Sequence, residues 1–162
     1  MKTVVLIGMS GTGKTSVAKL FAQNYNVEFF DSDKKIEELE QMTISQIFEI
    51  KGENYFRQKE KEIIKNYLQS ENMIVSIGGG AFQNFDTREL LLNTCNVIYL
   101  KTSPEIIYQR IKNDLSRPLL CGKMSVEKIT EMINLREKNY LLAHKTINTD
   151  NKTLQEIVME LK

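Results

Sequence analysis

One segment constrains the fold of this chain more than any other: residues 8–15, GMSGTGKT, match the spacing G-x-x-x-x-G-K-[ST]. The apolar run at residues 4–7 precedes this segment, and a helical pattern follows it. A buried strand, a glycine-rich turn and a helix in that order form a loop whose backbone N–H groups point toward bound phosphate. In such a loop Lys14 supplies charge for the β- and γ-phosphates, and the Thr15 hydroxyl is placed to ligate Mg²⁺. A plain glycine-rich turn would leave the Lys–Thr pair unexplained, so we expect the chain to bind a purine nucleoside triphosphate.

The size and composition of the chain indicate one ordinary globular domain. Its 162 residues can form one well-packed core but are too few for two comfortable domains. The hydrophobic fraction of 41% and the charged fraction of 27% are typical of soluble globular proteins. A formal net charge of +1 gives no electrostatic argument for nucleic-acid binding.

The sequence shows neither a membrane span nor a secretory signal. No stretch approaches the ~18 uninterrupted apolar residues that a span needs, and the run at residues 4–7 is too short for a signal. Cys95 and Cys121 have no partner motif and no metal-ligand spacing, so we expect reduced thiols and no disulfide. We therefore expect a cytoplasmic monomer that acts on small molecules, without a nucleic-acid or membrane partner.

Short apolar runs alternate with longer amphipathic segments along the chain. This alternation is typical of an α/β fold in which helices flank a parallel sheet. We expect a first helix at residues 14–24 and strands at residues 4–7, 27–30, 73–77, 96–100 and, more weakly, 144–148. Further helix starts are marked by capping boxes or by an N-terminal proline: Thr43 with Gln46, Asp86 with Glu89, Thr153 with Glu156, and Ser103-Pro104. The apolar period fails between residues 113 and 125, where we expect a mobile loop.

Three of the expected strands end in segments that can carry chemistry. They are the phosphate loop, Asp31-Ser32-Asp33 and Gly78-Gly79-Gly80. Glycines let the backbone pass close to a ligand and offer N–H groups to it. Because ligands of open α/β sheets bind beyond the carboxyl ends of the strands, we expect the three segments to meet at one site.

Asp31 and Asp33 allow two interpretations. One carboxylate can hold Mg²⁺ through its water shell while the other accepts a hydrogen bond from an attacking hydroxyl. Alternatively, one of them only caps a helix that begins near Lys34. An extended chain would put both side chains on one face, whereas a helix start would separate them. The third strand is followed by no acidic residue that could bind the metal, so Asp31 is the natural substitute.

Four arginines are candidates for binding anions. Arg57 either forms a surface ion pair with Glu60 or grips a carboxylate, and Arg136 either lies on a solvated helix face or does the same. Arg117 lies in the irregular loop and can swing in to place charge on transferring phosphoryl oxygens while expelling water. Arg110, on the helix before that loop, can stack on adenine.

Other conspicuous residue types receive a structural interpretation. His144 is the single histidine and begins the weak fifth strand. The seven methionines are scattered along the chain and are interpreted as core filler. We expect none of them to carry the chemistry.

Taken together, these residues resemble the shikimate kinase family, which are small phosphate-loop kinases of aromatic amino-acid biosynthesis. The similarity runs nearly end to end, and its order and spacing are specific although no single motif is. It is carried by residues 8–15, Asp31-Ser32-Asp33, Phe56-Arg57 with Glu60, residues 75–80, residues 117–120, and Arg136 with Tyr140.

The resemblance implies transfer of a phosphoryl group from ATP to the 3-hydroxyl of shikimate, which gives shikimate 3-phosphate and ADP. The implied fold has three layers and a five-stranded parallel sheet of order 2-3-1-4-5, as in nucleoside monophosphate kinases. It is a single domain over residues 1–162, with substrate-binding helices within residues 32–70, approximately, and a mobile lid near residues 113–124.

On the nucleotide side, the resemblance implies that Lys14 and Arg117 take part in catalysis, Arg117 from the lid. Thr15 would ligate Mg²⁺ with support from Asp31, and Arg110 would belong to the adenine pocket. The ATP phosphates would lie against Gly11, Thr12, Gly13, Lys14, Thr15 and Ser16.

On the acceptor side, the resemblance implies that Asp33 hydrogen-bonds the substrate hydroxyls and is the candidate base. Arg57 and Arg136 would clamp the shikimate carboxylate, and Gly79 and Gly80 would present backbone donors to the substrate.

The chain departs from the family pattern at two places. Ile77 stands where members often have threonine before the triple glycine, which leaves the backbone role of the glycines untouched. Residues 150–153 lack a proline that is common in the adenine-binding loop. The alternatives are a gluconate-type or nucleoside monophosphate kinase and, in another class, a nucleotide-dependent switch. Against a switch, the chain lacks the guanine-reading pattern Asn-Lys-x-Asp.

Overall fold

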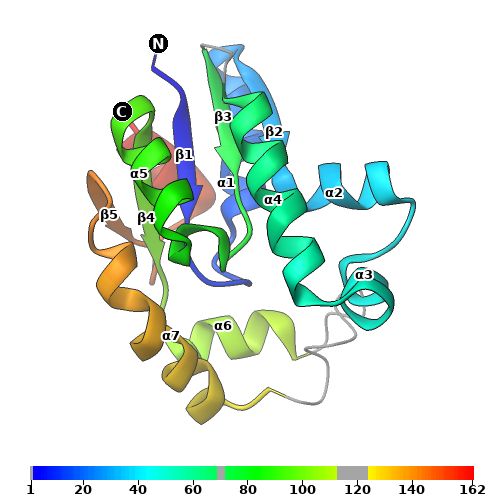
Figure 1. Cartoon of the computed structure of the whole chain (residues 1–162). Coiled ribbons are helices and arrows are strands. Elements are labelled where there is room, and N and C mark those ends of the chain that lie inside the picture. Colours follow the sequence, from blue (N-terminus) through cyan, green and yellow to red (C-terminus); the bar gives the residue numbers. More distant parts are fainter. Residues whose placement is uncertain (1, 69–71, 113–123) are drawn as a thin grey trace.

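The computed structural model describes residues 2–68, 72–112 and 124–162, which fold as helices around a five-stranded parallel sheet (Figure 1). The strand order is β2-β3-β1-β4-β5, as expected from the sequence. The strands are β1 (Val4–Ile7), β2 (Glu28–Asp31), β3 (Met73–Ser76), β4 (Asn96–Lys101) and β5 (Lys145–Asn148). All five expected strands are therefore present, each within one residue of its expected ends.

The helices connect these strands in chain order. The carboxyl ends of the strands therefore lie at one edge of the sheet, the lower edge in Figure 1. They are α1 (Lys14–Tyr25), α2 (Ser32–Glu40), α3 (Ile44–Lys51), α4 (Glu53–Tyr67), the short 3₁₀ helix η1 (Ala81–Gln83), α5 (Phe85–Thr94), α6 (Pro104–Ile111), α7 (Val126–Tyr140) and α8 (Leu154–Glu160). None of the helices within the described ranges is both long enough and apolar enough to span a bilayer.

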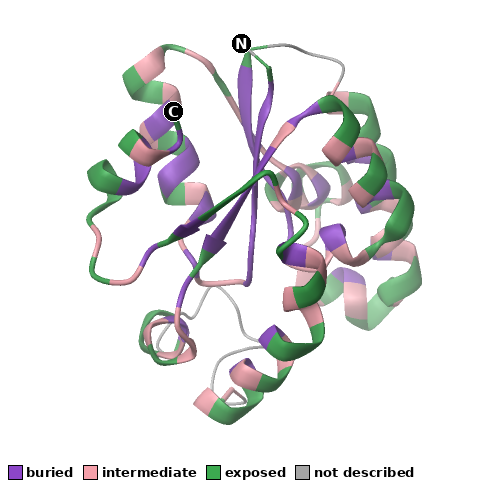
Figure 2. Ribbon diagram, turned by 90° about the vertical axis from the view of Figure 1, so that its left-hand side faces the viewer, coloured by how far each residue is buried: buried purple, intermediate pink, exposed green. Residues whose placement is uncertain are grey.

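The sheet separates two hydrophobic cores because alternate side chains of a strand point to opposite faces. Val5 and Ile7 of β1 pack with residues of α4 and α5 on one face. Val4 and Leu6 pack with residues of α1 and α8 on the other. Every residue of β1 is buried, which explains why this strand has a continuous apolar sequence (Figure 2).

Helix caps confirm two of the three expected capping boxes and correct the third. Thr43 and Thr153 both form the reciprocal box at the starts of α3 and α8. The box expected at Asp86 is wrong: Asn84 caps α5, and its side chain accepts a hydrogen bond from the backbone N–H of Thr87. The helix starts earlier because η1 ends at Gln83 and leaves Asn84 with the extended backbone of a cap residue.

Candidate active site

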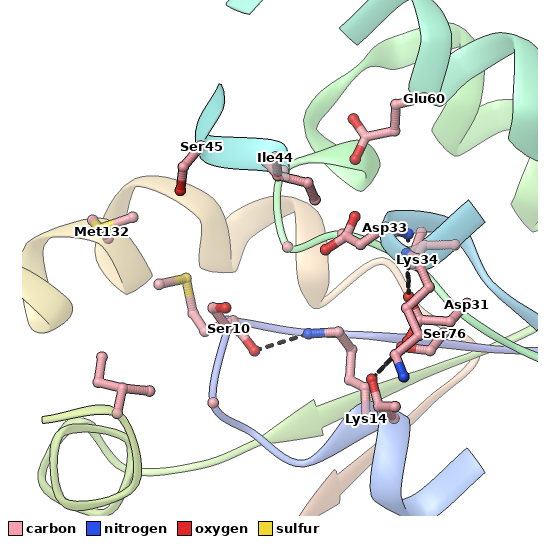
Figure 3. Close-up of a pocket in the computed structure, with 18 of the residues that line it drawn as sticks. Ser10, Lys14, Asp31, Asp33, Lys34, Ile44, Ser45, Glu60, Ser76 and Met132 are labelled. Atoms are coloured by element: carbon pink, nitrogen blue, oxygen red, sulfur yellow. Dashed lines mark hydrogen bonds between the residues drawn. The ribbon is translucent and has the colours of Figure 1, made fainter. Parts of the chain in front are cut away.

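A cavity of about 800 Å³ opens at the carboxyl edge of the sheet, in the size range of a small-molecule site (Figure 3). Its lining includes residues of the phosphate loop, Asp31 at the end of β2, Asp33 just after it, and the three glycines beyond β3. The convergence that strand topology predicts is therefore present. Residues of α3, α4, α6 and α7 complete the lining.

The phosphate loop has the backbone geometry that anion binding requires. Gly11 and Gly13 have φ of +87° and +93°, in the left-handed region where a side chain is strained. The Thr12 hydroxyl donates a 2.9 Å hydrogen bond to the Met9 carbonyl and closes the loop on itself. No side chain among the described residues caps α1, so the amides of its first turn are open to the cavity.

Lys14 is buried in the loop that precedes its own helix. Its Nζ donates 2.9 Å hydrogen bonds to the carbonyl oxygens of Gly8 and Met9. Both acceptors belong to the loop, so the ammonium is held beside the amides rather than extended into solvent. A cation held at this position lies where the phosphates of a bound nucleotide are expected.

Thr15, Asp31 and Ser76 bring three side-chain oxygens together beside the loop. The Thr15 hydroxyl donates a 2.7 Å hydrogen bond to Asp31 Oδ2, and its oxygen lies 3.5 Å from Ser76 Oγ. Oxygen ligands of this kind suit Mg²⁺, which keeps several waters and takes few protein ligands. The residues present therefore fit a magnesium ion bound jointly with nucleotide phosphates.

The helix start after β2 separates the two aspartates, the second of the two geometries considered from the sequence. Asp31 both contacts Thr15 and caps α2: its Oδ1 accepts from the backbone N–H groups of Asp33 and Lys34. The capping and functional interpretations of Asp31 are thus compatible. Asp33 lies in the first turn of α2 and lines the cavity (Figure 3).

Arg57 and Glu60 are not the surface ion pair that sequence spacing alone allowed. Their side chains on α4 are joined at 2.7 Å between Arg57 Nη1 and Glu60 Oε2, and the Glu60 side chain is only 3% exposed. Burial raises the pKa of Glu60 to about 7, and Asp33 adds to the rise, whereas Arg57 and Arg136 oppose it. Its second oxygen, Oε1, makes no hydrogen bond to the part of the chain that the structure describes.

The charged side chains of Glu60, Asp33 and Arg57 lie close to the triple glycine. A Cβ atom on Gly78 would lie 2.5 Å from Glu60 Oε1 and 2.7 Å from Asp33 Oδ1, and one on Gly80 would lie 2.6 Å from Arg57 Cζ. No larger residue fits there unless the charged side chains move. The glycines therefore allow two carboxylates and a guanidinium to approach the end of β3.

Arg136 approaches the same turn from α7. Its Nη1 lies 3.5 Å from the Met9 sulfur and 3.6 Å from the position of a Cβ on Gly79. Arg136 and Arg57 both line the cavity, so the structure brings the two expected carboxylate-binding residues together from helices distant in sequence. Neither lies on a purely solvated helix face.

Arg110 lines the nucleotide side of the cavity. Its Nη1 donates to the carbonyl oxygens of Gly11 and Thr12, at 3.3 and 3.2 Å. The guanidinium thus contacts the phosphate loop, and its stacking on adenine stays a prediction. Arg117, Cys121 and the lid expected near residues 113–124 fall outside the described residues, except for Met124.

Some lining residues were not identified from the sequence. Ser76 was noted only as part of the segment at residues 75–80, and no motif singled out Ile44 and Phe48 of α3. Met9, Met124 and Met132 belong to or pack against the core, as expected, and also line the cavity. The interpretation of the methionines as core filler is wrong for Met159, which is exposed.

Two further expectations concern residues away from the cavity. His144 is structural, since its Nδ1 accepts a 3.0 Å hydrogen bond from the backbone N–H of Val97 at the start of β4. Cys95 is buried and free.

Fold and site together define the class: a phosphate-loop phosphotransferase with an acceptor site for a small molecule. The sheet order, the loop geometry and the hydroxyl–carboxylate cluster belong to the nucleotide side. The arginine pair and Asp33, expected on the acceptor side, line the same cavity.

Comparisons with known proteins specify the class further. The family model described as shikimate kinase matches residues 10–162. A shikimate kinase from Sulfurihydrogenibium sp. is 42% identical over 99% of this chain and 96% of its own length. One from Persephonella marina is 38% identical over 99% and 97%. The chain belongs to the shikimate kinase family.

Solved structures agree with this assignment. The shikimate kinase from Acinetobacter baumannii in complex with shikimate superposes with a TM-score of 0.93 at 32% identity, covering 99% of this chain and 90% of that one. The enzyme from Bacteroides thetaiotaomicron gives a TM-score of 0.91 at 30% identity, covering 99% and 96%. A gluconokinase from Sinorhizobium meliloti, at 17% identity and a TM-score of 0.65 over 99% and 89%, shares the fold alone.

Proposed function

We propose that this chain transfers the γ-phosphoryl group of ATP to the 3-hydroxyl of shikimate, which gives shikimate 3-phosphate and ADP. The observation that carries the proposal is that Arg57 and Arg136, from α4 and α7, line the same cavity as the phosphate loop. Two guanidinium groups favour an acceptor that bears a carboxylate. Family membership supports the same substrate.

In this proposal the phosphate loop and Lys14 hold the triphosphate. The amides of the loop and of the first turn of α1 bind the phosphate oxygens, and the Lys14 ammonium turns from the loop carbonyls toward the γ-phosphate. Thr15 and Asp31 would hold Mg²⁺, which when bound neutralises charge on the β- and γ-phosphates. Arg110 and Arg117 complete the nucleotide side.

On the acceptor side, Arg57 and Arg136 hold the carboxylate, and Gly79 and Gly80 offer backbone N–H groups. Asp33 accepts a hydrogen bond from the 3-hydroxyl and thereby orients the hydroxyl oxygen toward the γ-phosphorus. The new O–P bond forms as the bond to the β–γ bridging oxygen breaks, and ADP leaves. The hydroxyl proton passes to Asp33 or leaves late, because the transition state of phosphoryl transfer is loose.

The remaining parts of the proposal concern the whole molecule. We place the enzyme in the cytoplasm, where ATP is available, and we infer that it acts as a monomer folded as one domain. The substrate-binding helices lie within residues 32–70, approximately.

The test is shikimate-dependent production of ADP in a coupled assay, with ³¹P NMR to identify the product. We expect shikimate 3-phosphate in the presence of Mg²⁺ and a loss of turnover when EDTA removes the metal. Gluconate and nucleoside monophosphates serve as competing acceptors. Turnover of one of them but not of shikimate would replace the proposal with another small-molecule kinase. Slow ADP release with no phosphorylated product would indicate a nucleotide switch.

A further inference from the structure

Tyr140 ends α7 with its hydroxyl beside the triple glycine. The residue is fully buried, and its ring stacks on Tyr99 of β4 with centroids 4.9 Å apart. The Tyr140 hydroxyl donates a hydrogen bond to the carbonyl oxygen of Gly79. This contact joins α7 to the turn that follows β3. A phenylalanine at this position could pack in the same way but could not make the hydrogen bond.

The acceptor of this bond lies in a tight turn. The backbone N–H of Ala81 donates a 3.0 Å hydrogen bond to the Gly78 carbonyl, which closes a turn with Gly79 and Gly80 at its centre. Gly80 has φ −93° and ψ −17°, the values of the third residue of a type I turn. The central peptide of such a turn, between Gly79 and Gly80, takes no part in the closing hydrogen bond and can rotate unless something holds it.

The geometry of a planar trans peptide links the two sides of this turn. The Gly79 carbonyl and the Gly80 N–H belong to one peptide unit, so they point in opposite directions. A donor that holds the carbonyl therefore also fixes the direction of the N–H. Gly80 lies against the Arg57 guanidinium: a Cβ atom on Gly80 would be 2.6 Å from Arg57 Cζ. Both residues line the cavity.

We propose that Tyr140 is a positioning residue, which holds the Gly79–Gly80 peptide so that the Gly80 N–H points at the carboxylate of the acceptor between Arg57 and Arg136. The inference rests on the proposed function, because it needs an anionic acceptor at this end of the cavity. Tyr140 itself does not touch the acceptor; it acts through the peptide. The effect falls on the binding of the acid rather than on the ATP site, which the hydroxyl approaches at the Met9 sulfur, 3.9 Å away.

The chemistry of the phenol suits this role. Burial raises the pKa of Tyr140, so the hydroxyl stays protonated and remains a donor at neutral pH. A carbonyl oxygen can only accept, so the direction of the bond is fixed. A preorganised N–H gains affinity because the peptide is already oriented before the acid arrives.

The test compares Tyr140→Phe with Tyr99→Phe. Each variant removes one oxygen from the same ring stack, but only the first removes the bond to Gly79. We expect Tyr140→Phe to raise the KM for shikimate about three- to tenfold, the range for loss of one hydrogen bond, with kcat and the KM for ATP nearly unchanged. Tyr99→Phe should leave all three constants near those of the wild type.

A second measurement needs no variant to fold. In the wild-type protein, the amide proton of Gly80 should shift downfield in ¹H–¹⁵N NMR spectra as shikimate is added, and ADP alone should not cause this shift. In Tyr140→Phe the shift should be smaller. A Gly80 amide that does not respond to saturating shikimate would overturn the inference even if Tyr140→Phe does not fold.

The outcomes separate this inference from the function on which it rests. If the wild-type protein phosphorylates shikimate but Tyr140→Phe keeps a wild-type KM, the positioning role is wrong and the proposed function stands. Equal losses in kcat and in both KM values would show a general structural role and overturn the inference as well. If the wild-type protein neither binds nor phosphorylates shikimate, both fail together.

Discussion

Glu60 occupies an unusual environment for a carboxylate on a helix of charged residues. It is buried beside Arg57, and Asp33 and Arg136 also influence its charge. Desolvation outweighs the attraction of the arginines, so its pKa rises to about 7. The folded protein therefore holds this proton more tightly than the unfolded chain, whose pKa is near the ordinary 4.5.

This difference predicts how stability depends on pH. The contribution of Glu60 is fully present below about pH 4.5 and is lost as the pH rises toward 7. Glu60→Gln has no carboxyl proton to lose. As the pH rises from 4.5 to 8, its free energy of unfolding should therefore increase relative to that of the wild type by about 2–3 kcal/mol. Urea unfolding at several pH values measures this. Glu62→Gln, on the exposed side of α4, is the control and should track the wild type.

Parallel pH profiles for wild type and Glu60→Gln would contradict the account of this carboxyl group. They would mean that Glu60 is ionised in the folded protein over the whole range. The Arg57 pair would then offset its desolvation completely.

Asp33 is predicted to matter more for turnover than for folding. In Asp33→Asn the side chain keeps its size but loses the charge that orients the acceptor hydroxyl and accepts its proton. We expect kcat to fall by about 10²–10⁴, with a smaller rise in the KM for shikimate. Steady-state kinetics test this, and Asp86→Asn on exposed α5 is the matched control. Turnover near that of the wild type would show that the charge of Asp33 is dispensable.

Arg57 and Arg136 are predicted to act on the acid and not on the nucleotide. Arg57→Ala and Arg136→Ala should each raise the KM for shikimate about 10- to 100-fold, the value of a charge-assisted hydrogen bond. The KM for ATP should change less than about threefold, since Arg57 pairs with Glu60 and Arg136 contacts the Met9 side chain rather than the amides at the start of α1. Unchanged shikimate affinity in both variants would count against the assignment.

At the scale of the elements, the structure corrects one helix start that was predicted from the sequence. Asn84 caps α5, whereas Asp86 lies in its first turn and pairs with Lys61 at 2.5 Å on the surface. We expect Asn84→Ala to lower the free energy of unfolding by about 1 kcal/mol and Asp86→Ala by less than about 0.5 kcal/mol. Chemical denaturation resolves the two. The reverse order would restore the capping box at Asp86.

The elements could be predicted where local sequence decides them. Strand β1 is a continuous apolar run because both of its faces are buried, and α3 begins at a capping box. The start of α2 at Ser32 was less evident, because Asp31 serves both the cap and the phosphate loop. The burial of Glu60 and the contact of Tyr140 with Gly79 could not be predicted. They depend on how α4 and α7 pack against the end of β3, which no local pattern encodes.

At the scale of the whole molecule, the parallel sheet explains why distant residues form one site. The strands all point the same way, so the segments after β1, β2 and β3 meet at one edge (Figure 1). Helices α4 and α7 then place Arg57 and Arg136 over that edge, although the two residues are 79 positions apart in the sequence. The two hydrophobic cores hold these helices and α1 on the same sheet.

The central claim is that a small acid is held by its carboxylate between Arg57 and Arg136 while its hydroxyl faces Asp33 and the bound triphosphate. The most direct test is a crystal structure of the protein with shikimate, ADP and Mg²⁺. We predict that the carboxylate contacts Arg57 and Arg136, and that the 3-hydroxyl lies within hydrogen-bond distance of Asp33. A carboxylate bound away from both arginines, or a 3-hydroxyl directed away from the phosphate loop, would contradict the account.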